Sequence, residues 1–153
     1  MSIEIQVLRD VTDEDLRAIN RLLSQLSGSA PPLDGDAVRR IATWEGNSLL
    51  AARSAGDIIG ILTLVTFPIP TGLRARIEDV VVDEAARGQG VGAALTREAI
   101  RLAQAADART IDLTTRPSRE AASRLYERLG FELRDTRVYR LAADAECLGK
   151  GSH

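Results

Sequence analysis

The chain has 153 residues, a formal net charge of −2 and a pI of about 5.5, with 44% hydrophobic and 27% charged residues. This size and composition are typical of one globular domain that buries a proper core. The acidic balance argues against nucleic acid as the main partner, and no apolar run reaches the roughly 18 residues of a membrane span. We therefore expect neither nucleic acid nor a membrane as a partner.

The only cysteine, Cys147, and the only histidine, His153, both lie at the C-terminal end. One cysteine forms no intramolecular disulfide, which fits a cytoplasmic location, and the N-terminus lacks the pattern of a signal peptide. A single terminal histidine argues against a His-centred triad and against a metal site, so we expect no metal. We predict one domain over residues 1–145 and a disordered tail over 146–153.

Alternating and helical hydrophobic patterns predict the elements of the first half of the chain. Thr12 followed by Asp15 is an N-cap signature for a helix whose apolar face carries Leu16, Ile19 and Leu22. In chain order we expect a strand over 3–8, a helix after Thr12, a short helix over 34–43, and strands over 48–53, 57–67 and 73–82. Turns are predicted at 54–56 and 68–72.

The second half predicts two more helices, each followed by a β segment. In chain order these are a helix over 90–106, a strand over 110–115, a helix over 117–129 and a final β segment over 131–141. In the last helix Ala122, Leu125 and Leu129 should face the core, and Gly130 should follow its C-terminus. The resulting order, β-α-α-β-β-β-α-β-α-β, predicts a mixed α/β layer structure.

The strongest chemical signal is a glycine-rich loop between an apolar strand and an amphipathic helix. Gly88, Gly90 and Gly92 alternate where the loop becomes the helix, and Arg87 precedes them. Glycines let a ligand come close to the backbone, and the first N–H groups of a helix have no partner within it. Together with the positive end of the helix dipole and a guanidinium group, they suit a pyrophosphate.

Other interpretations of this loop are weaker. A Walker A loop needs Gly-Lys-Ser/Thr, but the only lysine of the chain is Lys150. The spacing of Gly88, Gly90 and Ala93 fits a relaxed dinucleotide fingerprint, but residues 83–87 separate it from its strand, and the preceding strands resemble an antiparallel meander. A glycine-rich turn with a surface arginine is the remaining alternative.

Three segments, 77–83, 87–92 and 122–131, together resemble the GNAT superfamily of acetyl-CoA-dependent N-acetyltransferases. The Arg-x-x-Gly-x-Gly loop and the Leu-Tyr-Glu-Arg-Leu-Gly-Phe segment are more specific together than either is alone. The resemblance implies a GNAT-like mixed central sheet of about six to seven strands with about four helices. It also implies that strands four and five, here 73–82 and 110–115, splay apart.

The resemblance further implies where acetyl-CoA, the co-substrate, is bound. Its pantetheine arm would enter the gap and pair with the backbone of Val80 and Val82, which flank Val81. The pyrophosphate would contact Arg87, Gly88, Gln89, Gly90, Val91 and Gly92. Many members carry an asparagine where this chain has Arg119, which makes Arg119 a further candidate contact.

The resemblance implies direct attack of the amine in a ternary complex, which calls for a general base. Glu78 on the fourth strand is the candidate, acting directly or through water, because partial burial raises the pKa of a carboxylate. Alternatively, Glu78 is an exposed residue paired with Arg74 or Arg76. By strand alternation Asp79 faces the other way and is structural, unless a local bulge exchanges the two roles.

The departing thiolate also needs a proton, and Tyr126 is the candidate acid. The alternative is an amphipathic core tyrosine. A backbone N–H of the fourth strand near Val80 would stabilise the oxyanion. Cys147, in the tail, is a poor candidate for an acetyl-enzyme.

The acceptor amine is less well defined by the sequence. Arg74, Arg76 and Glu78 alternate onto one strand face, which suits a small amine bearing phosphate, phosphonate or carboxylate. The 77–79 stretch is similar to that of sugar-phosphate and aminoalkylphosphonate acetyltransferases, although two solvated arginines fit the pattern equally well. Acetylation of a protein or peptide amine, and a non-catalytic acyl-CoA-binding module, are the alternative functions. A homodimer is possible, with 131–141 as a pairing edge.

Overall fold

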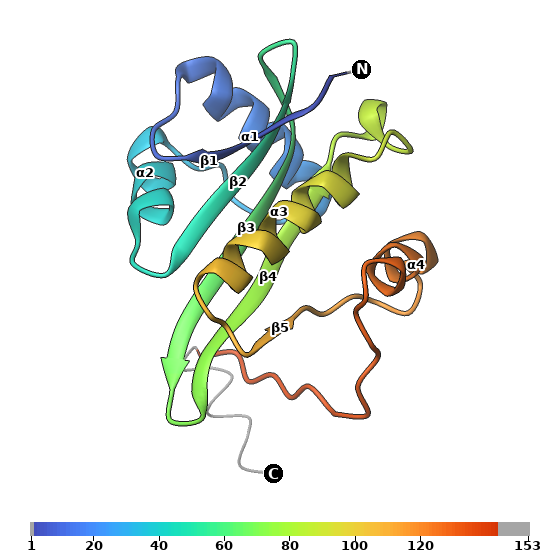
Figure 1. The fold of residues 1–153 in the computed structure, drawn as a ribbon. Coiled ribbons are helices and arrows are strands. Elements are labelled where there is room, and N and C mark those ends of the chain that lie inside the picture. The colour runs from blue at the N-terminus through green and yellow to red at the C-terminus, as the bar shows by residue number, and fades with distance from the viewer. Residues whose placement is uncertain (1, 144–153) are drawn as a thin grey trace.

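The computed structural model describes residues 2–143. Its centre is one five-stranded sheet with the order β1-β2-β3-β4-β5 (Figure 1). The strands are β1 (Glu4–Leu8), β2 (Asn47–Ser54), β3 (Asp57–Ile69), β4 (Gly72–Val82) and β5 (Thr110–Asp112). Neighbouring strands run antiparallel, except that β4 and β5 are parallel.

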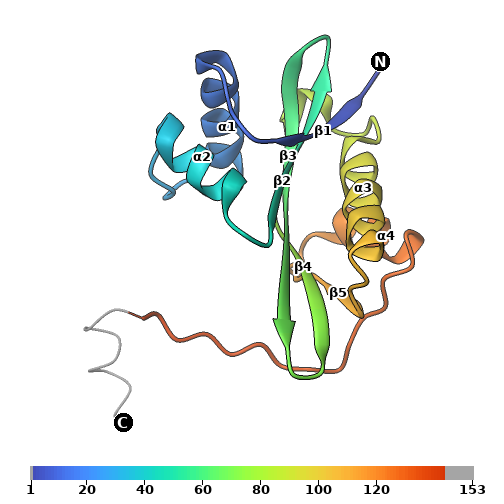
Figure 2. The same ribbon diagram turned by 60° about the vertical axis from the view of Figure 1, so that its left-hand side comes forward.

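Helices cover both faces of this sheet. Within the described residues they are α1 (Asp13–Leu26), α2 (Gly35–Thr43), α3 (Val91–Ala105) and α4 (Glu120–Arg128), with a 3-10 turn, η1 (Glu84–Ala86), before α3. The helices α1 and α2 lie on one face of the sheet and α3 lies on the other (Figure 2). The predicted mixed α/β class and the order of elements as far as α4 are therefore confirmed.

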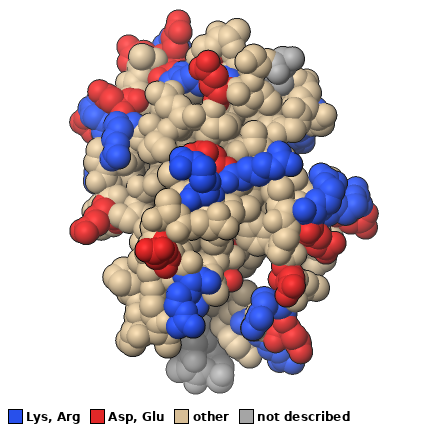
Figure 3. Space-filling model, viewed as in Figure 1, with Lys and Arg blue, Asp and Glu red and all other residues tan. Residues whose placement is uncertain are grey.

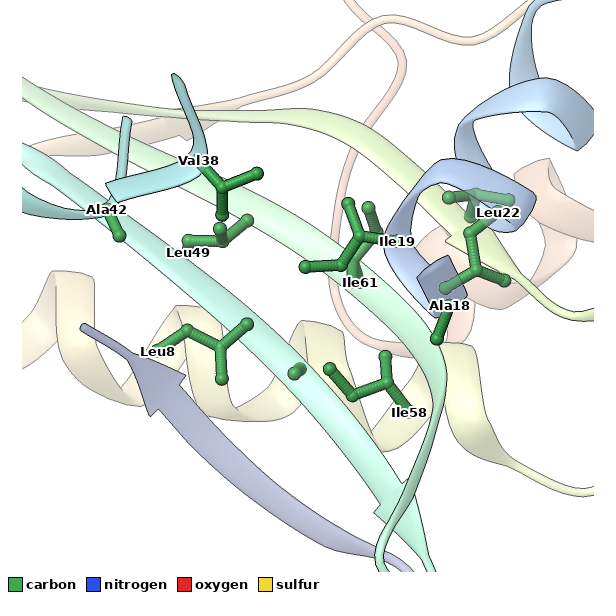
Figure 4. Close-up of a cluster of buried hydrophobic side chains, with 11 residues drawn as sticks. Leu8, Ala18, Ile19, Leu22, Val38, Ala42, Leu49, Ile58 and Ile61 are labelled. Atoms are coloured by element: carbon green, nitrogen blue, oxygen red, sulfur yellow. The ribbon is translucent and has the colours of Figure 1, made fainter. Parts of the chain in front are cut away.

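Each face of the sheet has its own hydrophobic core. The core under α1 and α2 contains Leu8, Ile19, Leu22, Val38, Leu49, Ile58 and Ile61 (Figure 4). The core under α3 contains Leu50, Leu62, Leu64, Ile77, Val91, Leu95 and Ala99. Burial of one such large aliphatic side chain stabilises the fold by about 1.5–3 kcal/mol. The core under α3 contains residues of both β4 and α3, so it fixes these two elements relative to each other.

The helix α1 begins where the sequence predicts. The Thr12 hydroxyl accepts the N–H of Asp15 at 3.1 Å, and the Asp15 carboxylate accepts the N–H of Thr12 at 3.3 Å. This is a reciprocal capping box. Arg53 of β2 donates two further hydrogen bonds to Asp15, at 2.9 and 3.0 Å, which join α1 to the sheet.

The C-terminal part of the described chain differs from the prediction. Residues 131–141 form no strand, so the expected six to seven strands exceed the five that residues 2–143 form. This segment runs past the end of the β3–β4 hairpin and away from the body (Figures 1 and 2). Within the described residues, the backbone of 132–143 makes no hydrogen bond. A strand needs such a partner, which is why the strand-like sequence stays extended and irregular here.

The elements around this segment are also shorter than predicted. The strand β5 ends at Asp112, and α4 begins at Glu120. None of the α4 residues is buried. The three side chains that were expected to face the core, Ala122, Leu125 and Leu129, are only half-buried. The predicted tail over 146–153 lies outside the described residues. No helix within 2–143 is long and apolar enough to cross a membrane.

Candidate active site

The predicted phosphate loop connects β4 to α3 through η1. Gly88 and Gly90 have φ angles of 78° and 82°, in the left-handed region that glycine adopts at the lowest cost. A Cβ built at either position would have no heavy atom within 4 Å outside its chain neighbours. The backbone conformation therefore requires these two glycines, and the space beside them is open.

The amides of this loop have no partner within the protein. Within the described residues, the backbone N–H groups of 88–93 donate no hydrogen bond. Gly90 is the N-cap of α3 and offers these amides no side chain. An uncapped helix start carries partial positive charge, and the exposed Arg87 stands next to it. The arrangement suits a diphosphate, because internal hydrogen bonds do not occupy its donors.

One edge of β4 is open beyond its short contact with β5. The last paired residues of the two strands are Arg76 and Asp112. The N–H of Asp83 donates to the Ile59 carbonyl of β3 at 2.8 Å, so by strand alternation the backbone groups of Val80 and Val82 point to the open side. The pairing of β4 with β5 ends at this point, and a pantetheine arm could pair along the free edge beyond it.

A β-bulge interrupts β4 next to this open edge. Asp79 and Val80 together stand opposite the single residue Leu62 of β3. The bulge reverses the face of the sheet to which alternate side chains point. Ile77 and Val81 are four residues apart and would share a face in a regular strand, but Ile77 packs in the core under α3 and Val81 packs in the core under α1 and α2. Simple alternation along β4 therefore fails at Asp79, whose φ is 51°.

The cluster of two arginines and one glutamate is brought together only in part. Arg76 and Glu78 form an ion pair, with Nη2 2.9 Å and Nε 3.1 Å from Oε1 of Glu78. Both side chains are partly exposed, so the pair contributes about 0–1 kcal/mol. Arg74 instead donates to the hydroxyls of Thr71, at 2.8 Å, and Thr110, at 3.1 Å. Neither threonine was predicted from the sequence as a partner of Arg74. The role of Glu78 as a base stays a prediction.

The helix α4 holds Tyr126 close to the start of α3. A Cβ at Gly92 would lie 3.4 Å from Cδ2 of Leu125, so the absence of a side chain at Gly92 lets α4 come close to α3. The ring of Tyr126 meets Phe131 edge to face, with ring centroids 5.8 Å apart. Burial raises the pKa of Tyr126, and the nearby charge of Arg119 acts in the opposite direction. The phenol therefore keeps its proton at neutral pH.

The candidate site consists of an open strand edge and the start of a helix. Acidic and basic side chains are interspersed over the face of the molecule that Figure 3 shows. The hollows found on the described surface lie around α2, where their walls include Asp34, Arg39 and Trp44. They contain none of the predicted site residues, and we assign them no role in the reaction.

Comparisons with known proteins agree with this fold. Residues 16–131 match the model of the Acetyltransferase (GNAT) family. The chain therefore belongs to this family, and it is an acyl-CoA-dependent acetyltransferase. It is 32% identical over 139 residues to a glucosamine 6-phosphate N-acetyltransferase of Trypanosoma brucei brucei, a match that covers 86% of this chain and 92% of that protein.

Solved structures are similar over nearly the whole described fold. A transcriptional regulator from Bacillus halodurans C-125 is 30% identical with a TM-score of 0.75, over 91% of this chain and 99% of that one. A Trypanosoma brucei acetyltransferase is 28% identical with a TM-score of 0.74, again over 91% and 99% of the two chains.

Proposed function

We propose that this chain transfers the acetyl group of acetyl-CoA to the primary amine of a small phosphorylated molecule, of the class of the amino-sugar phosphates. The carrying observation is the line of Arg74, Arg76 and Glu78 along β4, which ends where β5 leaves the sheet. Guanidinium groups bind phosphate through charge-assisted hydrogen bonds. The 32% identity to a glucosamine 6-phosphate N-acetyltransferase supports the same substrate class.

Acetyl-CoA would lie along the open edge of β4. Its pantetheine arm would pair with the backbone of Val80 and Val82, and the amides of 88–92 with Arg87 would hold the pyrophosphate. Hydrogen bonds to a charged group contribute about 1.5–3 kcal/mol each, so several of them suffice for firm binding. The charge of Arg119 near Tyr126 makes it a further candidate contact to the cofactor.

Transfer would proceed by direct attack of the amine on the thioester. A backbone N–H near Val80, on the open side of β4, would stabilise the oxyanion. Tyr126 would give its proton to the departing thiolate of CoA. A carboxylate of β4 would first take a proton from the substrate ammonium.

The test is the release of free thiol from acetyl-CoA with amino-sugar phosphates, amino acids, polyamines and peptides. We expect kcat/KM for glucosamine 6-phosphate to exceed that for glucosamine by about tenfold or more, the effect of 1.4 kcal/mol. Arg74→Ala and Arg76→Ala should remove this preference. Arg101→Ala is the matched control, because Arg101 pairs with Glu98 on α3, away from β4. Equal effects of Arg76→Ala and Arg101→Ala would rule out the phosphate site.

Two alternatives predict other outcomes of the same assay. Faster turnover of peptides than of amino-sugar phosphates would indicate a protein or peptide amine as the acceptor. CoA binding without thiol release from any amine would indicate a non-catalytic module. The similarity to a structure named as a transcriptional regulator is the observation that favours the second alternative.

We also propose that two copies associate through residues 131–143, called the arm below. The arm carries Leu133, Val138, Tyr139 and Leu141, which are between 64% and 95% exposed. Its residues follow a strand pattern, and β5 is an edge strand of the sheet. An unpaired apolar strand and an open sheet edge are complementary, which favours pairing of the arm with a second copy of the chain.

A further inference from the structure

Asp79 holds a backbone conformation that residues with a side chain seldom adopt. Its φ of 51° lies in the left-handed region. This region is strained for a residue with a side chain, although Asp and Asn tolerate it better than other residues. Glycine is the usual residue at the left-handed position of a bulge. The chain therefore keeps a carboxylate where glycine would be less strained, and strain of this kind is a pointer to function.

The bulge puts this carboxylate at the open edge of β4. Asp79 lies beyond Arg76, the last residue of β4 that pairs with β5. It directly precedes Val80, whose backbone faces the side assigned to the thioester. The side chain of Asp79 is exposed, so an amine bound at this edge could reach it.

Glu78 and Asp79 differ in their electrostatic surroundings. Glu78 is engaged by Arg76, whose Nη2 lies 2.9 Å from its Oε1. In contrast, no hydrogen bond or ion pair within residues 2–143 involves the carboxylate of Asp79. Although this side chain is exposed, desolvation by the surrounding protein, and next the charge of Glu78, raises the pKa of Asp79 above its ordinary value. A raised pKa makes the ionised carboxylate a better proton acceptor near neutral pH.

We propose, on the basis of the proposed function, that Asp79 is the group that accepts the proton of the substrate ammonium, while Glu78 and Arg76 position the substrate. The freed lone pair forms the N–C bond with the thioester carbonyl, and the C–S bond breaks. The sulfur leaves as a thiolate and takes a proton from Tyr126, which regains one from the acetylated nitrogen. The proton on Asp79 passes to solvent, so one proton is released in each turnover.

Two substitutions at this position separate chemistry from structure. Asp79→Asn and Asp79→Gly both remove the carboxylate, and both tolerate a positive φ. We expect kcat with the best amine of the panel to fall about 100-fold or more in each variant, the lower end of what a general base contributes. The affinity for CoA, measured by calorimetry, should change less than about twofold. The melting temperature at pH 7 should be equal to or higher than that of the wild type.

The stability expectation follows from the sign of the pKa shift. A carboxyl whose pKa is raised on folding stabilises the folded state only while it is protonated, so its ionised form lowers stability at neutral pH. Asp79→Asn removes this penalty, and its stability advantage over the wild type should shrink as the pH falls. A purely structural carboxylate predicts the reverse, a loss of stability in both variants.

Glu78→Gln is the comparison that assigns the two roles. We expect it to raise the KM of the phosphorylated amine more than it lowers kcat, because it releases Arg76 from its partner. The fall of kcat at acidic pH should persist in Glu78→Gln and disappear in Asp79→Asn. A fully active Asp79→Asn variant, or loss of the acidic limb only in Glu78→Gln, would overturn the assignment of Asp79 as the base. Either result would leave the proposed function standing. A wild type that acetylates no amine would overturn the assignment together with the proposed function.

Discussion

Tyr126 packs its ring against Phe131 in the helix that contacts the start of α3 through Leu125. The two rings meet edge to face, and burial raises the pKa of the phenol, so the hydroxyl keeps its proton through the neutral range. Exposed Arg119 at the start of α4 opposes this shift and would stabilise a phenolate for the moment between giving and regaining a proton. The family motif predicted this residue, but the surroundings of its hydroxyl could be seen only in the fold.

Replacing Tyr126 by phenylalanine tests the acid directly. We expect kcat to fall about 100-fold, because the thiolate would leave without its proton donor, while CoA affinity stays nearly constant. Steady-state kinetics and calorimetry check the two quantities. Tyr139→Phe is the control, since Tyr139 is the other tyrosine and is exposed in the arm. Full turnover of the Tyr126 variant would remove this residue from the mechanism.

Among the elements, α1 is held to the sheet by the partly buried ion pair of Asp15 and Arg53 as well as by its apolar face. The side chains of Asp15 and Arg53 are 12% and 18% exposed, and the Arg53 guanidinium holds the pKa of Asp15 below its ordinary value. The ionised form of Asp15 therefore stabilises the fold. This contribution is complete above the unfolded-state pKa of about 3.9 and is lost as the pH falls through the lower folded-state value.

Asp15→Asn should accordingly destabilise the protein by about 1.5–3 kcal/mol at pH 7, because Arg53 loses its carboxylate partner and keeps only its hydrogen bonds to Gln6 and to the Gly56 carbonyl. Urea unfolding at pH 7 and pH 3 measures this, and the gap between wild type and variant should narrow at pH 3. Asp36→Asn serves as the control, because Asp36 forms an exposed pair with Arg39 that contributes about 0–1 kcal/mol. Equal losses for the two variants would show that the pair of Asp15 and Arg53 contributes no more to stability than an exposed pair.

Prediction from sequence worked for elements whose signals are local. The capping box of α1 and the positive-φ glycines before α3 are readable, because neighbouring residues create both features. The bulge at Asp79 was only an open alternative, since it depends on the register of β4 against β3. The prediction of a final strand over 131–141 was wrong for the described chain. Alternating apolar residues indicate a tendency to form a strand, but they do not show whether a neighbouring strand is present to pair with it.

The same arm is the main feature at the scale of the whole molecule. We expect the protein to sediment as a dimer and the double variant Val138→Asp, Tyr139→Asp to sediment as a monomer, because charges would prevent strand pairing. Both residues are exposed, so the fold should survive the change. Trp44→Asp, at the exposed residue that follows α2, should remain dimeric. A monomeric wild type, or a dimeric double variant, would contradict pairing through the arm.

Binding of CoA is the most direct test of the proposed function, because each proposed step requires acetyl-CoA bound at the helix start of α3. Calorimetry should show one CoA bound for each chain, with at least about tenfold weaker binding in Gly90→Ala. Gly56→Ala is the matched control, because Gly56 has a φ of 86° and equally open surroundings, but lies in the turn between β2 and β3. It should lose similar stability and keep its CoA affinity. No binding to the intact folded protein, or equal affinity in both variants, would contradict the assignment of the loop.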